Sequence, residues 1–116
     1  MVLTRDEILA KRNVRQREPI EVPGWGTLYV AKFNARDRDR FEEIVTGGVP
    51  GKVNLRNVRA QLVPLLVVKE DGTRMFDDGD SDAIGELDSD AVQVIIDAGF
   101  RINGLNANAL EEAAKN

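Results

Sequence analysis

Cysteine and histidine are both absent from this chain of 116 residues. Without cysteine there can be no disulfide, zinc–thiolate site or thiol nucleophile, a composition that suits a reducing compartment. Without histidine the chain lacks the commonest general base and metal ligand near neutral pH, so Ser-His-Asp and Cys-His catalytic arrangements are excluded. Carboxylates, lysines and one tyrosine remain. We therefore expect a protein that is not an enzyme and that holds no cofactor or metal.

Long apolar runs are also missing. No stretch approaches the roughly 18 residues that a membrane-spanning helix needs, and the first segment, MVLTRDEILAKR, lacks the apolar centre of a signal peptide. We expect an intracellular protein that does not enter a membrane.

Aromatic residues are few: one tryptophan, one tyrosine and four phenylalanines. Trp25 lies in a Pro-Gly-Trp-Gly turn, and Tyr29 follows four residues later. Two interpretations of Trp25 stay open. The indole either folds over the turn and packs on the edge of the core, or stands partly exposed as a contact for another protein, a role in which Trp and Tyr are enriched.

The net charge of −4 is unevenly distributed. Residues 1–60 carry 12 basic and 8 acidic side chains, whereas residues 61–116 carry 4 basic and 12 acidic ones. This asymmetry predicts weak head-to-tail self-association, with an unevenly charged solvated surface as the alternative. The basic stretch 11–17 has no interleaved aromatics and the overall pI is acidic, so we expect no nucleic-acid binding.

Two segments resemble ligand-binding motifs but do not match the full pattern of either motif. The acidic segment 77–82 resembles a calcium loop, but Ala83 stands where the EF-hand needs glycine and Ser89 where it needs glutamate. The glycines of residues 47–52 match no phosphate-binding loop. We interpret both segments as solvated turns.

The first half of the chain predicts a helix, a hairpin and a second helix. A capping box of Thr4 and Glu7 begins a short helix over about residues 5–12, and a basic linker follows. Alternating apolar residues on both sides of the Trp25 turn predict a hairpin over about residues 20–33. Asn34 then caps a helix that buries Phe41.

The second half predicts further helices and another hairpin. Asn54 is the expected cap of a helix that Pro64 kinks or ends early, and Asp-Gly at 71–72 predicts a hairpin over about 67–76. Ser81 and Ser89 are expected caps of a short and a longer helix. The longer one, 90–103, is apolar almost all round and should be buried in the core or in an interface. Gly104 is expected to end it, and Asn106 to cap a last helix.

The resulting fold class is α+β and mostly helical, with four to six helices and two short β-hairpins. We expect residues 1–18 to form an N-terminal helix and basic linker, and residues 19–116 to form one compact domain.

Taken in order, several stretches resemble one protein family: VPGWGTLYV, ARDRDRFEEIV, NLRNVRAQL, KEDGTRMF, IGEL and FRINGLNANALEEAAKN. The series is similar to the tail assembly chaperones of long-tailed, siphovirus-type bacteriophages and covers most of residues 4–116. Pro64 departs from it by interrupting a stretch that is usually unbroken helix. The residues that match the family's motifs are Arg38, Asp39, Phe41, Glu42, Asn54, Leu55, Arg56, Arg59, Ala60, Asp71, Gly72, Phe76, Arg101, Asn103, Gly104 and Leu105.

The resemblance implies a non-catalytic chaperone, made in the cytoplasm of the infected bacterium and absent from the mature virion. It would bind the tape measure protein and keep it soluble before the tail tube polymerises. It would also reach the tail tube protein through a longer, frameshifted form. The alternative is a structural head–tail connector or minor tail protein that enters the virion. The residues expected to contact partners are Trp25, Tyr29, Phe100, Leu105 and Leu110.

Overall fold

The computed structural model describes residues 1–13, 15–106, 108–110 and 112. Within these residues the fold is α+β and mostly helical, with five α-helices and an antiparallel sheet in the order β1-β2-β3, which confirms the predicted class. The elements, with two 3-10 turns, are α1 Arg5–Ala10, η1 Lys11–Asn13, β1 Arg17–Val22, β2 Gly26–Ala31, α2 Ala35–Thr46, α3 Val58–Leu66, β3 Val67–Val68, η2 Asp78–Asp80, α4 Ser81–Ile84 and α5 Ser89–Ile102.

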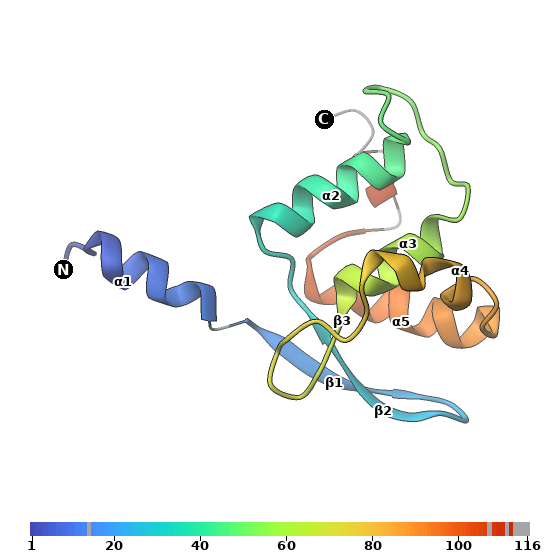
Figure 1. Ribbon diagram of the computed structural model, residues 1–116, viewed down its shortest axis with the longest axis horizontal. Helices are drawn as coiled ribbons and strands as arrows, with labels where there is room; N and C mark the ends of the chain where they lie inside the picture. Colours follow the sequence, from blue (N-terminus) through green and yellow to red (C-terminus); the bar gives the residue numbers. More distant parts are fainter. Residues whose placement is uncertain (14, 107, 111, 113–116) are drawn as a thin grey trace.

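Helix α3 lies at the centre of the body, between α2, α4 and α5, and the β1–β2 hairpin packs against α5 (Figure 1). Phe41 of α2, Leu66 of α3 and Ile95 of α5 are nearly inaccessible to solvent. The aromatic rings extend this core, because Phe41 lies 5.5 Å from Phe33 and 5.9 Å from Phe100, measured between ring centroids. Helix α5 is buried on its apolar sides as predicted, with Asp97 and Arg101 exposed.

The first predicted hairpin is present and begins three residues earlier than expected. Ile20 faces Leu28 across the two strands, and both side chains pack against the core. Between the strands Gly24 and Gly26 adopt φ values of +82° and +125°, which only glycine takes up readily.

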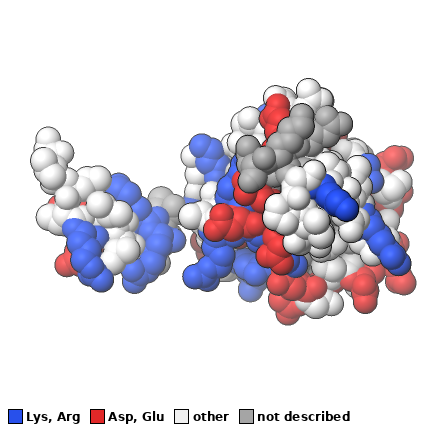
Figure 2. All heavy atoms as spheres, turned by 90° about the horizontal axis from the view of Figure 1, so that it is seen from above, with Lys and Arg blue, Asp and Glu red and all other residues white. Residues whose placement is uncertain are grey.

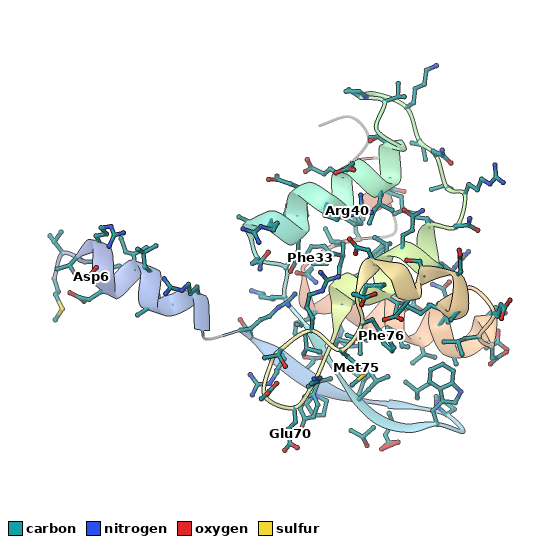
Figure 3. The ribbon with its side chains drawn as sticks, viewed as in Figure 1. Asp6, Phe33, Arg40, Glu70, Met75 and Phe76 are labelled. Atoms are coloured by element: carbon teal, nitrogen blue, oxygen red, sulfur yellow. The ribbon has the colours of Figure 1, made fainter. Side chains whose placement is uncertain are left out.

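The second predicted hairpin is shorter than expected. Its first strand is the two-residue β3, where Val68 pairs with Tyr29 of β2, and its second is reduced to one bridge between Val68 and Arg74. Met75 and Phe76 follow the bridge (Figure 3). The pairing ends there because the Asp77 side chain accepts a hydrogen bond from the Gly79 amide and turns the chain into η2.

Three predicted helix caps are wrong, whereas the predicted Asn34 cap of α2 is confirmed, and Asp37 completes a capping box with it. Helix α3 begins at Val58, not after Asn54, because the Asn54 amide bonds the Val45 carbonyl at 2.7 Å and so closes the preceding loop. Ser81 and Ser89 are first helical residues, not caps.

Aspartate side chains supply the caps that were expected from the two serines. Asp77 caps η2, which leads directly into α4, and Asp88 Oδ2 accepts from the Ala91 amide at 3.3 Å to begin α5. Pro64 lies inside α3, and the helix ends two residues later, in agreement with the early end expected.

The end of α5 is closed as the sequence predicts. Gly104 has φ of +68°, its amide bonds the Arg101 carbonyl at 3.1 Å, and the Leu105 amide bonds the Phe100 carbonyl at 2.8 Å. This pair of bonds is the Schellman motif, which needs a left-handed residue at the Gly104 position. Of the last predicted helix, the Asn106 cap is described: its Oδ1 accepts from the Asn108 amide at 2.8 Å. Residues 107, 111 and 113–116 of that prediction lie outside the described residues.

Helix α1 projects from one end of the molecule (Figure 1), and none of its residues is buried. We call residues 1–12 the arm. The body begins immediately afterwards, at Arg15, whose guanidinium bonds the Asp37 carboxylate at 2.6 Å and the carbonyls of Leu65 and Lys32 at 3.1 and 3.0 Å. Arg17 and Glu18, assigned above to the linker, lie in β1, and Arg17 Nε bonds the Glu70 carbonyl at 2.7 Å.

Candidate partner-binding surfaces

Trp25 occupies the tip of the β1–β2 hairpin and is 47% exposed. Its amide bonds the Val22 carbonyl at 2.9 Å, so the backbone of the turn is fixed while the indole reaches into solvent. The core cluster includes Ile20 and Leu28 of the same hairpin but not Trp25. The exposure favours the interpretation of Trp25 as a contact for another protein.

Tyr29 does not share the position of Trp25. It lies in the middle of β2, opposite Pro19 of β1 and Val68 of β3, and is half-buried. Because successive side chains of a strand point to opposite faces, Tyr29 lies on the face away from Leu28 and Val30, which pack in the core. The structure therefore separates the two residues that the sequence places four apart.

A shallow surface with apolar and charged side chains lies where the edge strand β1 crosses α5. We call it the hairpin surface. The ion pair between Arg101 and Glu18 joins the two elements beside it. It encloses about 430 Å³ and is lined by Pro19, Ile20, Glu21, Val94, Asp97, Ala98 and Arg101. An apolar helix can lie along it, with the Trp25 tip at the end of the same hairpin.

A second hollow, here called the α3–α5 groove, brings together two other predicted contact residues. Phe100 and Leu110 line it. The rest of its apolar lining comes from Leu55 before α3, from Val58 and Leu62 of α3, and from Ile96 of α5. The groove encloses about 250 Å³. At its rim Arg59 bonds Gln93 at 2.8 Å and Gln93 bonds Asp97 at 2.8 Å, so the polar groups there are satisfied without a ligand.

The α3–α5 groove continues around the start of α3. Leu55, Val58 and Arg59 also line a hollow of about 280 Å³, together with Ile84 and Leu87. That hollow shares Asn57, Ala60 and Gly85 with a third one of about 410 Å³. The third is polar and lined by Arg40 (Figure 3), Asp78, Asp82 and Glu86. The surface thus changes along its length from an apolar end at Phe100 to an acidic end at Asp82.

Leu105, the fifth predicted contact, is half-buried and packs against the core at the end of α5. Its amide completes the Schellman motif described above. The structure therefore places Leu105 in a helix-ending contact, while its role in binding stays a prediction.

The residues that match the family's R-x-N-G-L motif hold the fold together. Asn103 Oδ1 accepts from the Phe33 amide at 2.7 Å, and its Nδ2 donates to the carbonyls of Gly99 and Ala31 at 2.8 and 3.3 Å. One side chain thus joins the end of α5 to the end of β2. Gly104 supplies the left-handed turn.

The motif residues of α2 also have mostly internal contacts. Phe41 is core, and the guanidinium carbon of Arg38 lies 5.5 Å from the centre of its ring. Glu42 pairs with Arg38 at 3.4 Å, whereas Asp39 is exposed. A cation over an aromatic face is attracted to it, so this group shields one edge of the core.

The motif residues of the loops act in turns. Asn54 Oδ1 accepts from the Arg56 amide at 3.0 Å and stands against Gly47, where a Cβ would lie 2.7 Å from its Nδ2. Hydrogen bonds from the Thr73 hydroxyl (2.7 Å) and amide (2.9 Å) lower the pKa of the Asp71 carboxyl below its ordinary value. Gly72 has φ of +89° in the same turn.

Five exposed apolar side chains outside these expectations lie on the arm, and others lie on the body at Val49, Val53, Met75 and Leu87; those of the arm are Met1, Val2, Leu3, Ile8 and Leu9. Leu55, which has helical spacing with the buried residues Val58, Leu62 and Leu65, is 52% exposed because its segment precedes α3. The sequence predicts the helix of the arm, but it does not show which surface packs against the apolar side chains of that helix.

Among the described residues, no three carboxylates gather in a way that would hold a metal ion. Within the same part of the chain, no helix has the length and apolarity to span a bilayer. Comparison of the chain with protein-family models, with curated proteins and with solved structures gave no match.

Proposed function

We propose that this chain is a tail assembly chaperone of a long-tailed bacteriophage, which binds the tape measure protein and keeps it soluble until the tail tube polymerises. It acts without catalysis, in the cytoplasm of the infected bacterium, and is absent from the mature virion. A longer frameshifted form would extend its contacts to the tail tube protein. The ordered motif series of residues 22–116 supports the family, and the surfaces described above support the mode of action.

The observation that carries the proposal is the exposed Trp25 on a hairpin whose backbone is fixed. A large aromatic side chain held in a defined turn loses little conformational freedom on binding, which is why Trp residues dominate many interface energies. The adjoining hairpin surface offers apolar area from Ile20, Val94 and Ala98. An apolar helix is the kind of partner that such a shape accepts.

Co-expression with the tape measure protein tests the proposal. The wild-type chain should bring the client into the soluble fraction and co-purify with it. Trp25→Ala should keep the fold and raise the apparent dissociation constant at least about tenfold, as expected for loss of a hot spot. Val49→Ala is the matched control, because Val49 is equally exposed at 49% but lies in the loop after α2.

Two outcomes would contradict the proposal. A client that stays insoluble with the wild-type chain would remove the chaperone function. Mass spectrometry that finds the chain in purified virions would instead support the alternative, a head–tail connector or minor tail protein. An unfolded Trp25→Ala variant would show that the indole stabilises the hairpin, and Trp25→Phe would then separate folding from binding.

A further inference from the structure

The arm and the α3–α5 groove are the two apolar features that the proposed client contact leaves without a role. We propose that the arm of one copy of this chain binds in the groove of a second copy. The inference goes beyond the client contact and needs no client for its test. It assigns the predicted self-association to defined surfaces.

The arm presents apolar side chains that its own chain does not cover. Ile8 and Leu9 are 52% and 39% exposed on α1, and Met1, Val2 and Leu3 precede them. Asp6 projects from the same helix, far from the body (Figure 3). Burying an exposed leucine or isoleucine side chain against an apolar surface removes apolar area from water and is favourable. The arm therefore gains stability from any surface that fits it.

The arm cannot reach the acidic end of the groove in its own chain. Arg15 is held by Asp37, Leu65 and Lys32, so only residues 13 and 14 separate the arm from a fixed point. From that point α1 extends away from the body, whereas α4 and the start of α3 lie at the opposite end of the molecule (Figure 1). A neighbouring copy is required to bring Lys11 and Arg12 to that end.

The charges on the two surfaces determine how the arm of one copy is oriented in the groove of the other. Along the arm, apolar residues 1–3, 8 and 9 flank the charged residues 5–7 and are followed by Lys11 and Arg12. Along the three adjoining hollows, apolar Phe100 and Leu110 lie at one end, and Asp82 and Glu86 lie at the other, where Arg40 also lines the surface and Asp78 is paired with Arg74. In Figure 2 basic side chains gather on the arm, and acidic ones are prominent on the body, with basic ones among them. Placing Lys11 and Arg12 against Asp82 and Glu86 sets the apolar part of the arm along the apolar part of the groove.

A contact between two different surfaces of identical copies does not close on itself unless a rotation brings the chain into a ring. Each copy offers one arm and one groove, so the arrangement produces chains of copies. The mass in solution should then rise with concentration without a plateau at the dimer.

Sedimentation equilibrium at low salt, on the full chain and two single variants, tests this directly. Leu9→Asp removes the arm contact and Leu55→Asp removes the groove contact; both side chains are exposed, so the fold should be retained. Each should raise the apparent dissociation constant at least about tenfold. Val49→Asp, with a side chain of similar exposure away from both surfaces, should behave as the wild type.

Mixing the two variants gives the sharpest result. The Leu9→Asp chain keeps an intact groove and the Leu55→Asp chain an intact arm, so an equimolar mixture should form a dimer and stop there. The proposal is overturned if the wild type stays monomeric at millimolar concentration, if either variant associates as the wild type does, or if the mixture remains monomeric.

Charge reversal provides a second test that avoids the apolar residues. Lys11→Glu with Arg12→Glu, and separately Asp82→Lys with Glu86→Lys, should each weaken association, and the chain carrying all four changes should recover it. Failure of the recovery would contradict the proposed direction of the arm. Trp25→Ala should leave the mass distribution unchanged, so the outcome is separate from that of the client experiment.

Discussion

A side chain caps the start of both α1 and α5, yet α1 is free of the body and α5 packs against α3 and the hairpin. Thr4 caps α1 and Asp88 caps α5 by the same kind of bond to a backbone amide. The difference lies in what surrounds them. Helix α1, of six residues, buries none of them, whereas α5, of fourteen residues, buries six and packs against α3 and the hairpin. Capping begins a helix, but packing supplies most of its stability.

The largest difference in the free energy of unfolding should come from replacing an isoleucine by alanine in α5 and in α1. Ile95→Ala removes a side chain that is 2% exposed and should lower the free energy of unfolding by about 3 kcal/mol. Ile8→Ala on the arm should change it by less than about 0.5 kcal/mol. Urea denaturation followed by circular dichroism measures both. Equal effects would mean that α1 packs against the body in solution.

The junction between the two regions should give the next largest effect. Asp37→Asn leaves the buried Arg15 guanidinium without its counter-charge, and only 16% of that side chain is exposed, so the loss should be about 2 kcal/mol. Glu43→Gln breaks the exposed pair with Arg40 at 2.8 Å and should cost less than about 0.5 kcal/mol. If the two variants have the same stability, Arg15 does not fix the start of the body.

Removing the caps should distinguish local from global stability. Asp88→Ala should lower the unfolding free energy by about 1 kcal/mol, because α5 is part of the cooperative unit. Thr4→Ala should reduce the helicity of residues 5–10 and leave the unfolding midpoint unchanged. Hydrogen exchange of the α1 amides provides the direct measurement, and a shifted global midpoint for Thr4→Ala would contradict the separation of arm and body.

The smallest effect on stability is expected for the exposed hydrogen bonds between Asp71 and Thr73. Asp71 is fully exposed, and its hydrogen bonds to Thr73 lower its pKa. A lowered pKa adds stability above the ordinary value of about 3.9, and that contribution is lost as the pH falls through the folded-state pKa. Carboxyl NMR titration should show Asp71 below that value and Thr73→Ala nearer to it. An unchanged titration in Thr73→Ala would show that the hydroxyl does not act on Asp71.

Signals confined to a few neighbouring residues predicted the structure well. The Pro-Gly-Trp-Gly turn, the Asn34 cap and the Gly104 helix end are each settled by local backbone geometry. The predictions were wrong where two neighbouring residues could each cap the same helix. Asp88 and Ser89 can both cap a helix, and only the position of α5 against the body decides between them.

The surfaces were less predictable for the same physical reason. Leu55 has the spacing of a core residue, but the bond between the Asn54 amide and the Val45 carbonyl holds it outside α3. Phe100 and Leu110 were expected to contact partners, but the sequence did not place them in one groove. The acidic end formed by Asp78, Asp82 and Glu86 depends on how α4 packs beside α3, which no local pattern encodes.

Asn103 has a consequence for how the chain is made. Its side chain bonds the backbone at Ala31 and Phe33, which are synthesised some seventy positions earlier. A nascent chain therefore holds its hairpin without the α5 contact until the ribosome has released the last turn of that helix. Completion of the body is a late event of translation, and the faces of β1 and β2 that α5 covers stay open until then.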